Sequence, residues 1–316
     1  MGAGHSAAIA EFRHLCALGL PSHEVVPQLL RHLHELIPSA TNLFDWVDAD
    51  GRIVDYYTEP PYLPEVARRY FDDFYNAREG EALPPYSAHV RAASGVRRAP
   101  RSPRFYESEF YRQIWRPRGV HHCIEAVVRD GERPLGSVVL YRRADEAEFS
   151  AAEVASLQAL LPYFARALKG AGDYCGARAL AAPPALVMAS AGGAIRYASA
   201  EGRLRLALAL HPCLNRRACG AACSGADEEI AAQIASLAAE LRLRPASGAS
   251  LHRTNRWGRF SLNAQWLEPD SPAGEPLIGI TVAHEVPLPL AIGAALVRLP
   301  LSPRQRELCL LLAQGS

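Results

Sequence analysis

Two Asp-Gly pairs, Asp50-Gly51 and Asp130-Gly131, constrain the fold of this 316-residue chain more than any other feature. An Asp-Gly pair between two apolar segments is a strong local signal for a β-hairpin, because glycine readily takes the positive φ that a tight hairpin turn requires. The chain therefore contains at least two antiparallel strand pairs. Their expected strands are residues 41–47 and 52–57 at the first turn, and 121–129 and 135–141 at the second.

Amphipathic helices are expected around these hairpins. Apolar residues recur at helical spacing in residues 7–20, 23–37, 63–77 and 151–168. Ser22 is the expected N-cap of the second helix. The aromatic segment 105–115 predicts a short helix that stops before Pro117, whereas the Pro- and Arg-rich segment 78–105 predicts no regular element. Hairpins framed by helices indicate an α+β domain rather than a parallel sheet.

A second α+β unit is expected farther along the chain. Glycines, alanines and a Pro pair in residues 171–183 indicate a linker. Beyond it we expect strands at 186–190, 195–199, 250–254, 259–267 and 277–284, and helices at 200–210 and 227–243. The fold class is therefore α+β with two antiparallel-sheet domains, 1–170 and 184–290, followed by residues 291–316, which combine a linker with a final helix.

Composition and charge exclude some classes of protein. Apolar residues make up 49% of the chain and charged residues 21%, a balance typical of soluble globular domains. A formal charge of +1 does not call for nucleic acid or a membrane surface as a partner of the whole chain. There is no apolar run of membrane-spanning length and no secretory signal pattern at the start. We expect a cytoplasmic protein with no membrane partner, whose seven cysteines are thiols.

The C-terminal segment, LSPRQRELCLLLAQG at residues 301–315, has the residues expected at both ends of a helix. Ser302 is the expected N-cap, and Pro303 follows at the first helical position, where its missing N–H costs nothing. Gly315 stands where a C-cap belongs. The apolar stripe expected to face a core consists of Leu308, Leu311 and Leu312.

This same segment resembles the opening of the helix-turn-helix domain of LuxR-type transcription regulators. In that family it is the first of four helices, and the recognition helix comes later. The resemblance implies a bacterial regulator that is cut off just inside its DNA-binding domain, so that DNA would be bound only by a longer parent protein. The residues that would begin the DNA interface are Ser302, Arg304 and Arg306.

Two further resemblances cover the rest of the chain. Residues 257–260, followed by a strand, and residues 277–282, leading to Pro287, resemble the PAS-like domain that precedes the DNA-binding domain in many long LuxR-type regulators. Residues 7–168 resemble a GAF domain. The stretches that carry this second resemblance are Val127–Gly131, Pro134–Gly136, Arg142, Phe149-Ser150 and the long helix after them. The implied order is a GAF-like sensor in 1–170, then a PAS-like domain in 184–290.

GAF and PAS folds commonly enclose a ligand beside the sheet, which implies a small-molecule effector here. The aromatic residues between positions 44 and 115 fit such a pocket, although core packing is the better explanation for each of them in isolation. Arginines are dense between positions 91 and 118 and indicate either an anionic effector or a solvated loop. The candidate ligand contacts are Trp46, Tyr56, Tyr70, Phe74, Phe110, Tyr111 and Trp115, with His121 as a polar contact.

A cysteine cluster offers an alternative function. It consists of His211, Cys213, Cys219 and Cys223. Three thiolates and one imidazole suit tetrahedral zinc or another soft metal, although the spacing is not that of a standard zinc knuckle. The neighbouring Arg216 and Arg217 would lower thiol pKa values, which suits a redox sensor. A loop with incidental cysteines remains the third interpretation.

Catalytic motifs are lacking: the sequence has no phosphate-binding glycine loop, no GxSxG and no HExxH. Strand alternation places Cys123 and Glu125 on the face of His121, which leaves a small enzyme on a GAF-like fold as a further alternative. We predict a protein that is not an enzyme but the ligand-sensing part of a regulator. We also predict a homodimer, with the helices in 7–37 and 151–168 as its seam.

Overall fold

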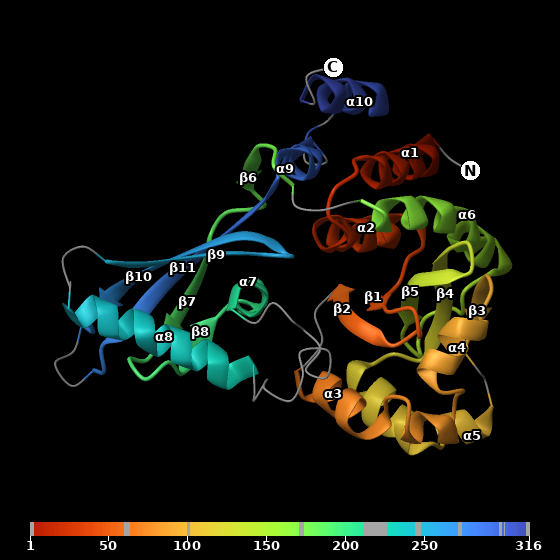
Figure 1. Cartoon of the computed structure of the whole chain (residues 1–316), viewed down its shortest axis with the longest axis horizontal. Helices are drawn as coiled ribbons and strands as arrows, with labels where there is room; N and C mark the ends of the chain where they lie inside the picture. The colour runs from red at the N-terminus through yellow and green to blue at the C-terminus, as the bar shows by residue number, and fades with distance from the viewer. Residues whose placement is uncertain are drawn as a thin grey trace. The chain divides into compact units, whose positions relative to one another are not determined.

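The computed structural model describes residues 3–59, 64–99, 102–170, 174–210, 226–243, 248–270, 274–296, 299 and 301–313. Two compact units divide them: residues 3–170 form unit 1, and those from 174 on form unit 2. Each unit is built on one antiparallel sheet with helices against it (Figure 1). The predicted α+β class with two antiparallel sheets is therefore confirmed.

The sheet of unit 1 has the strand order β2-β1-β5-β4-β3, and every neighbouring pair is antiparallel. Its strands are β1 (Thr41–Val47), β2 (Ile53–Glu59), β3 (Val96–Arg98), β4 (His122–Asp130) and β5 (Arg133–Arg142). Both predicted hairpins are present, as β1–β2 and β4–β5. Gly51 and Gly131 have φ values of 75° and 58°, which is why the turns call for glycine.

Three long helices lie on one side of this sheet: α1 (Ala3–Ala17), α2 (Ser22–Leu36) and α6 (Ala151–Leu168). Helices α2 and α6 pack against the strands, and α1 packs against both of these helices. The ring of Phe164 lies 5.1 Å from that of Phe12 and 6.1 Å from that of Phe44, so α6, α1 and β1 share one aromatic core. The predicted N-cap at Ser22 is wrong. Pro21 is the cap residue, and the Ser22 hydroxyl instead accepts a hydrogen bond from Trp46 Nε1 at 3.0 Å.

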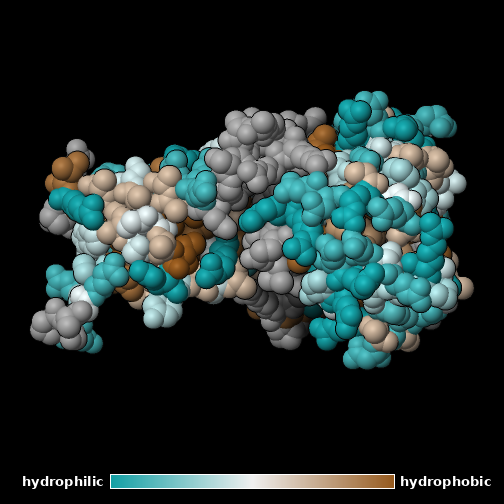
Figure 2. Space-filling model, turned by 90° about the horizontal axis from the view of Figure 1, so that it is seen from below, coloured by the Kyte–Doolittle hydropathy of each residue, from teal (hydrophilic) through white to brown (hydrophobic). Residues whose placement is uncertain are grey.

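Short segments surround the other face of the sheet. They are α3 (Pro64–Arg69), the π-helical turn η1 (Tyr70–Phe74), the 3-10 turn η2 (Arg78–Glu81), α4 (Tyr86–Ala92), α5 (Pro103–Tyr106), the π-helical turn η3 (Tyr111–Trp115) and the 3-10 turn η4 (Arg116–Arg118). Seen from below, the surface of unit 1 is mostly hydrophilic, so these segments turn their apolar side chains inward (Figure 2).

The helix predicted for 63–77 is present as α3 and η1, although its second part is a π turn, whereas the single helix predicted for 105–115 is divided into α5 and η3. Each is a short helix followed by a π turn, which adds a residue to the turn and redirects the side chains. The first segment ends where Asn76 takes a left-handed backbone with φ 52°, and the second where Gly119 does so with φ 67°. Residues 78–105, for which the sequence predicted no regular element, contain η2, α4 and β3.

Unit 2 has a six-stranded sheet in the order β8-β7-β11-β10-β9, with β6 also paired to β11. Its strands are β6 (Arg178–Leu180), β7 (Ala185–Ala189), β8 (Ile195–Ala198), β9 (Ala249–Asn255), β10 (Gly258–Leu267) and β11 (Leu277–Pro287). Its helices are α7 (Ala200–Leu210), α8 (Ala226–Leu243), α9 (Leu288–Leu296) and α10 (Pro303–Ala313). Strand β6 falls inside the predicted linker, and α9 crosses the predicted boundary at 290.

The core of unit 2 forms where α7 and α8 pack against the sheet. Leu206 of α7 and Ile234 of α8 are fully buried, as are Leu262 of β10 and Ile280 of β11. His284 is packed into the same unit with its ring stacked on Phe260 at 4.3 Å. Its Nε2 donates to the carbonyl oxygen of Trp257 at 2.8 Å. Burial lowers the pKa of His284 to about 4, so this ring is neutral.

Helix α10 begins as the sequence predicts. The Ser302 hydroxyl accepts from the Gln305 N–H at 3.4 Å, and Gln305 Oε1 accepts from the Ser302 N–H at 2.8 Å, which makes a reciprocal capping box. The predicted core-facing stripe is wrong at Leu308 and Leu312, which are 57% and 64% exposed. Leu310 is buried, α10 packs against α9, and the side chain of Leu311 lies outside the described residues.

Candidate ligand-binding site

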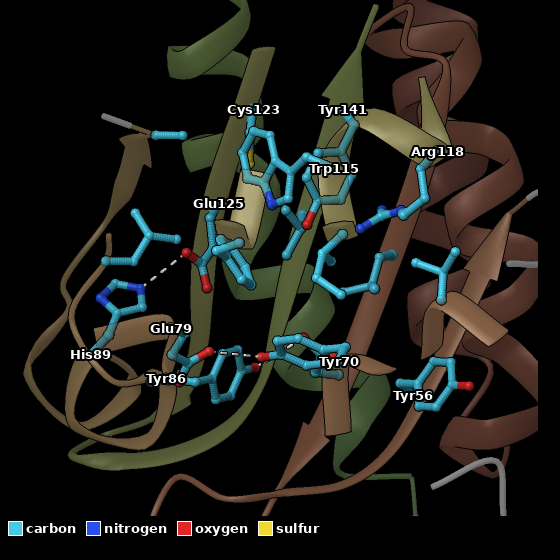
Figure 3. Close-up of a pocket in the computed structure, with 18 of the residues that line it drawn as sticks. Tyr56, Tyr70, Glu79, Tyr86, His89, Trp115, Arg118, Cys123, Glu125 and Tyr141 are labelled. Atoms are coloured by element: carbon cyan, nitrogen blue, oxygen red, sulfur yellow. Dashed lines mark hydrogen bonds and ion pairs between the residues drawn. The ribbon is translucent and has the colours of Figure 1, made fainter. Parts of the chain in front are cut away.

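A cavity of about 120 Å³ lies inside unit 1, between the sheet and the short segments on its second face (Figure 3). Alternation along each strand decides which side chains reach it. The sheet residues that line it are Leu43 and Asp45 of β1, Tyr56 of β2, Arg97 of β3, Cys123 and Glu125 of β4, and Val139 and Tyr141 of β5. The intervening residues, such as Phe44 and Ile124, are buried on the other side of the sheet.

One wall of the cavity is apolar and largely aromatic. Phe110, Ile114 and Trp115 come from η3 and the residue before it, and all three are buried. The Trp115 ring meets the ring of Tyr141 edge-to-face at 5.3 Å, with both beside the cavity (Figure 3). An apolar cavity of about 150 Å³ can hold a benzene molecule, so this space suits a ring-sized ligand.

Glu125 is the most heavily paired carboxylate of the cavity. His89 Nε2 lies 3.1 Å and Arg97 Nη2 lies 3.3 Å from its Oε2, and the Ser137 hydroxyl donates to its Oε1 at 2.9 Å. Burial by itself would raise the pKa of Glu125. The hydrogen bonds and positive charges of its partners outweigh that effect and lower the pKa, so this carboxylate is ionised.

Glu79 is a buried carboxyl that joins two of the short segments. It accepts backbone N–H groups from Asn76 at 2.8 Å and from Tyr86 at 2.6 Å, and the Tyr70 hydroxyl donates to it at 3.2 Å (Figure 3). Burial raises its pKa in spite of these three donors. Its bonds fix η2 against the start of α4, so Glu79 shapes the cavity as well as lining it.

Asp45 is the buried acid at the sheet side of the cavity. The Tyr86 hydroxyl donates to its Oδ2 at 3.0 Å. Burial raises the pKa of Asp45 well above the usual value, and the charges of Glu125 and Glu79 act in the same direction. The Tyr86 hydrogen bond and the charge of Arg118 oppose the shift but do not cancel it. Asp45 therefore holds a proton more readily than an ordinary aspartate.

Arg118 brings a positive charge to the cavity from η4. Its guanidinium carbon lies 4.6 Å from the centre of the Tyr141 ring, a cation–π geometry. Figure 3 shows its guanidinium pointing toward Tyr141 and Trp115. Of the arginines that are dense between 91 and 118, Arg97 and Arg118 line the cavity, and most of the others are exposed.

The eight residues predicted to contact a ligand do not all lie at one site. Phe74 is buried behind the wall, with its ring 5.5 Å from that of Phe110. Trp46 faces the opposite side of the sheet and stacks on His23 at 4.2 Å, because it follows Asp45 by one residue. Neither of them is a lining residue. The four that do line the cavity are Tyr56, Tyr70, Phe110 and Trp115.

Tyr111 and His121 lie at a separate surface hollow. The Tyr111 hydroxyl and His121 Nδ1 are 2.7 Å apart, and the His121 ring stacks on Tyr106 at 4.5 Å. Burial and the nearby His122 lower the pKa of His121. These two residues do not line the cavity with the four contacts above, and their role as ligand contacts stays a prediction.

Sequence reasoning missed most of the polar groups in the cavity. Asp45 carried a usable signal, since an acid directly between Phe44 and Trp46 in a strand calls for a buried partner. The alternation that placed Cys123 and Glu125 on one face was also correct. Glu79 and His89 carried no comparable signal, because they lie in segments with no clear period.

Cys123 does not form the cysteine–histidine site that was considered as an enzyme alternative. Its side chain is buried, and burial raises the pKa of the thiol well above its usual value. A nucleophilic cysteine needs a lowered pKa, because the thiolate is the reactive form. The thiol of Cys123 is therefore protonated, and its role in the cavity is packing.

The predicted metal site at His211, Cys213, Cys219 and Cys223 lies outside the described residues and stays a prediction. Within the described ranges, no group of three or more His, Cys, Asp or Glu side chains is arranged to hold a metal ion. Of the residues predicted to begin a DNA interface, Ser302 caps α10 and Arg304 is exposed, whereas Arg306 is only partly exposed. No described helix has both the length and the apolarity of a membrane span.

Comparisons with known proteins do not assign a family. No protein-family model matches the chain, and no curated protein matches it. Among solved structures, the E. coli DhaR(N)–DhaL complex is 11% identical, with 90% of each chain covered and a TM-score of 0.30. The sensor region of a sensor histidine kinase is 14% identical, covering 52% of this chain and 63% of the other, with a TM-score of 0.21. Both TM-scores are too low to support an argument.

Proposed function

We propose that unit 1 is a sensor module that binds a small organic molecule in the cavity over its sheet. The observation that carries the proposal is the cavity itself, of about 120 Å³, which combines an aromatic wall with buried polar groups. That combination is the usual design of a small-molecule site, where apolar contacts supply affinity and a few polar groups fix orientation.

The proposal favours binding over catalysis. The thiol of Cys123 is held protonated by burial, and Glu125 is already engaged by His89, Arg97 and Ser137. Neither group is therefore available as a strong nucleophile or base. A bound molecule would instead hold the short segments α3, η1 and η3 against the sheet, which is a way to convert ligand binding into a change of conformation.

The regulator part of the proposal rests on the resemblance of residues 301–315 to a LuxR-type helix-turn-helix domain. In it, the effector state of unit 1 is passed to DNA in a longer cytoplasmic parent protein. A homodimer, with the helices in 7–37 and 151–168 as its seam, is part of this proposal. Phe12 of α1 and Phe164 of α6 are buried against one another within unit 1, so such a seam would use the remaining faces of these helices.

A matched pair of substitutions tests ligand binding. Val139→Phe places a ring into the cavity from β5, whereas Val54→Phe adds the same bulk on β2 at a side chain that is 37% exposed. We expect native mass spectrometry to detect a co-purified small molecule, or a compound screen to raise the melting temperature, with the wild type and Val54→Phe. Val139→Phe should lose both signals. Equal ligand binding by the two variants would contradict the proposal.

A further inference from the structure

The cavity in unit 1 is rich in carboxyl groups for its size. Asp45, Glu79 and Glu125 reach it from β1, η2 and β4. The basic side chains that line it are Arg97, Arg118 and, when protonated, His89. Arg97 and His89 both form ion pairs with Glu125. The charge of the Glu125 carboxylate is therefore already balanced by its neighbours.

Asp45 has a different environment. The Tyr86 hydroxyl donates a hydrogen bond to its Oδ2 at 3.0 Å, and a hydroxyl supplies no positive charge. The other charged groups that act on it are Glu125 and Glu79, which repel its negative form, and Arg118, which favours it. Two negative groups and one positive group therefore act on Asp45, and a further positive charge beside it would favour its ionised form.

The aromatic rings of the cavity also favour a positively charged ligand. Tyr56, Tyr70 and Trp115 line the same space, and the faces of aromatic rings attract cations. Arg118 already stacks on the ring of Tyr141, which shows the same preference at work within the site. Desolvation strengthens such contacts, and the cavity wall around Trp115 and Phe110 is buried.

We propose that the ligand of this cavity is a small organic cation, an amine or quaternary ammonium attached to a ring-sized body, with Asp45 as its counter-ion. The inference rests on the proposed ligand-binding function of unit 1 and names the chemical class of that ligand. The ring would lie against Trp115 and Phe110, and the ammonium would lie between Asp45 and the faces of Tyr56 and Tyr70.

Such binding releases a proton. Without a cation beside it, Asp45 keeps its proton to a higher pH than a free aspartate. A bound ammonium favours the ionised form, so the proton leaves as the ligand enters. Below the raised pKa the apparent affinity should therefore fall about tenfold for each pH unit, and above that pKa it should become constant.

Three probes that share one ring test the charge preference. Benzylamine is cationic, benzyl alcohol is neutral and benzoate is anionic, and each can be titrated into the full chain by calorimetry. We expect benzylamine to bind at least tenfold more tightly than either of the others. Its affinity should be higher at about pH 8 than at about pH 5.5, a range in which the amine itself stays protonated.

Two substitutions that each remove one negative charge test whether Asp45 is the counter-ion of the bound cation. Asp45→Asn keeps the size of the side chain but removes the carboxylate, and Asp73→Asn makes the same change at an exposed position on η1. We expect Asp45→Asn to lose at least tenfold in benzylamine affinity and to lose the pH dependence. Asp73→Asn should behave as the wild type. The wild-type probe series and pH profile stand by themselves if Asp45→Asn fails to fold.

The other outcomes separate this inference from the proposed function. Tight benzoate binding that Arg118→Gln abolishes would overturn the cationic class and leave ligand binding by unit 1 intact. Equal binding of benzyl alcohol and benzylamine would do the same. If none of the three probes binds, the cation inference fails. If, in addition, Val139→Phe changes no ligand signal, the proposed function fails with it.

Discussion

The sheets of the two units have the same strand order but differ in what packs against them. In unit 1 the strand order is β2-β1-β5-β4-β3, and in unit 2 it is β8-β7-β11-β10-β9, which is the same order when each unit's strands are counted from its first hairpin. Yet unit 1 holds a cavity with three carboxyl groups, whereas two helices of unit 2 pack directly on its sheet. The shared topology is therefore a scaffold that does not by itself create a site.

The difference arises in the connections between strands. In unit 2 the segment between β8 and β9 supplies α7 and α8, helices of 11 and 18 residues that lay apolar stripes along the sheet. In unit 1 the corresponding connection is divided among α3, η1, η2 and α4, none longer than seven residues. Such short segments meet the sheet at separate points, and space remains among them.

The largest expected effect is the loss of stability on replacing a core leucine with alanine, which should differ between the two units. Leu262 in unit 2 is fully buried, whereas Leu43 in unit 1 is buried but faces the cavity. Leu262→Ala should cost about 3–4 kcal/mol of unfolding free energy, because it opens a new hole in a filled core. Leu43→Ala should cost about 2 kcal/mol, the low end of the range for a buried leucine, because it only enlarges a space that already exists. Urea denaturation of both variants measures the difference, and equal costs would contradict the contrast in packing.

The next effect is a pH dependence of stability that comes from a titrating histidine of unit 2. His284 has a pKa of about 4 in the folded state, below its ordinary value of 6.5. As the pH falls below 6.5 the unfolded chain takes up a proton that the folded chain refuses. Stability should therefore be complete above about pH 6.5 and fall by about 3 kcal/mol as the pH drops toward 4.

Hydrogen–deuterium exchange, followed on peptides of each unit, measures this loss where it occurs. His284→Gln keeps a donor for the Trp257 carbonyl and should flatten the pH dependence of unit 2. His252→Gln, at an exposed position on β9, is the matched control and should leave it unchanged. A pH dependence that survives His284→Gln would show that another group is responsible.

Much of the scaffold could be predicted from sequence, for physical reasons. The Asp50-Gly51 and Asp130-Gly131 pairs fix their hairpins locally, because only a few residue types tolerate the backbone of a tight turn. The long helices follow from a period of 3.6 residues that extends over several turns. Both signals are contained within a short stretch of sequence, so one chain is enough to read them.

The candidate site could not be predicted in the same way. Phe74 and Phe110 were both expected to line the cavity, yet a π turn directs one into the core and leaves the other at the wall. His89 reaches Glu125 across two segments that share no periodic pattern. These positions depend on backbone irregularities such as the left-handed Asn76, whose side-chain Oδ1 accepts a hydrogen bond from the Ser87 N–H in another segment.

The smallest effect compares two capping boxes with different surroundings. Ser150 caps α6 in unit 1 through Glu153, and Ser302 caps α10 in unit 2 through Gln305. Glu153 also accepts from Arg142 at 2.5 Å, so the box of unit 1 is tied to the end of β5. We expect Ser150→Ala to cost about 1 kcal/mol and Ser302→Ala about 0.5 kcal/mol, both within the usual range for a lost N-cap.

The partner residues explain why these two costs should differ. With Ser150 gone, Glu153 still accepts the backbone N–H of residue 150 and still holds Arg142, but the N–H of Glu153, a half-buried residue, loses its acceptor. At Ser302 the freed N–H of Gln305 is exposed, and water replaces the hydroxyl. Thermal denaturation of the two alanine variants measures both costs. A larger loss at Ser302 would mean that the start of α10 is more tightly held than its exposure indicates.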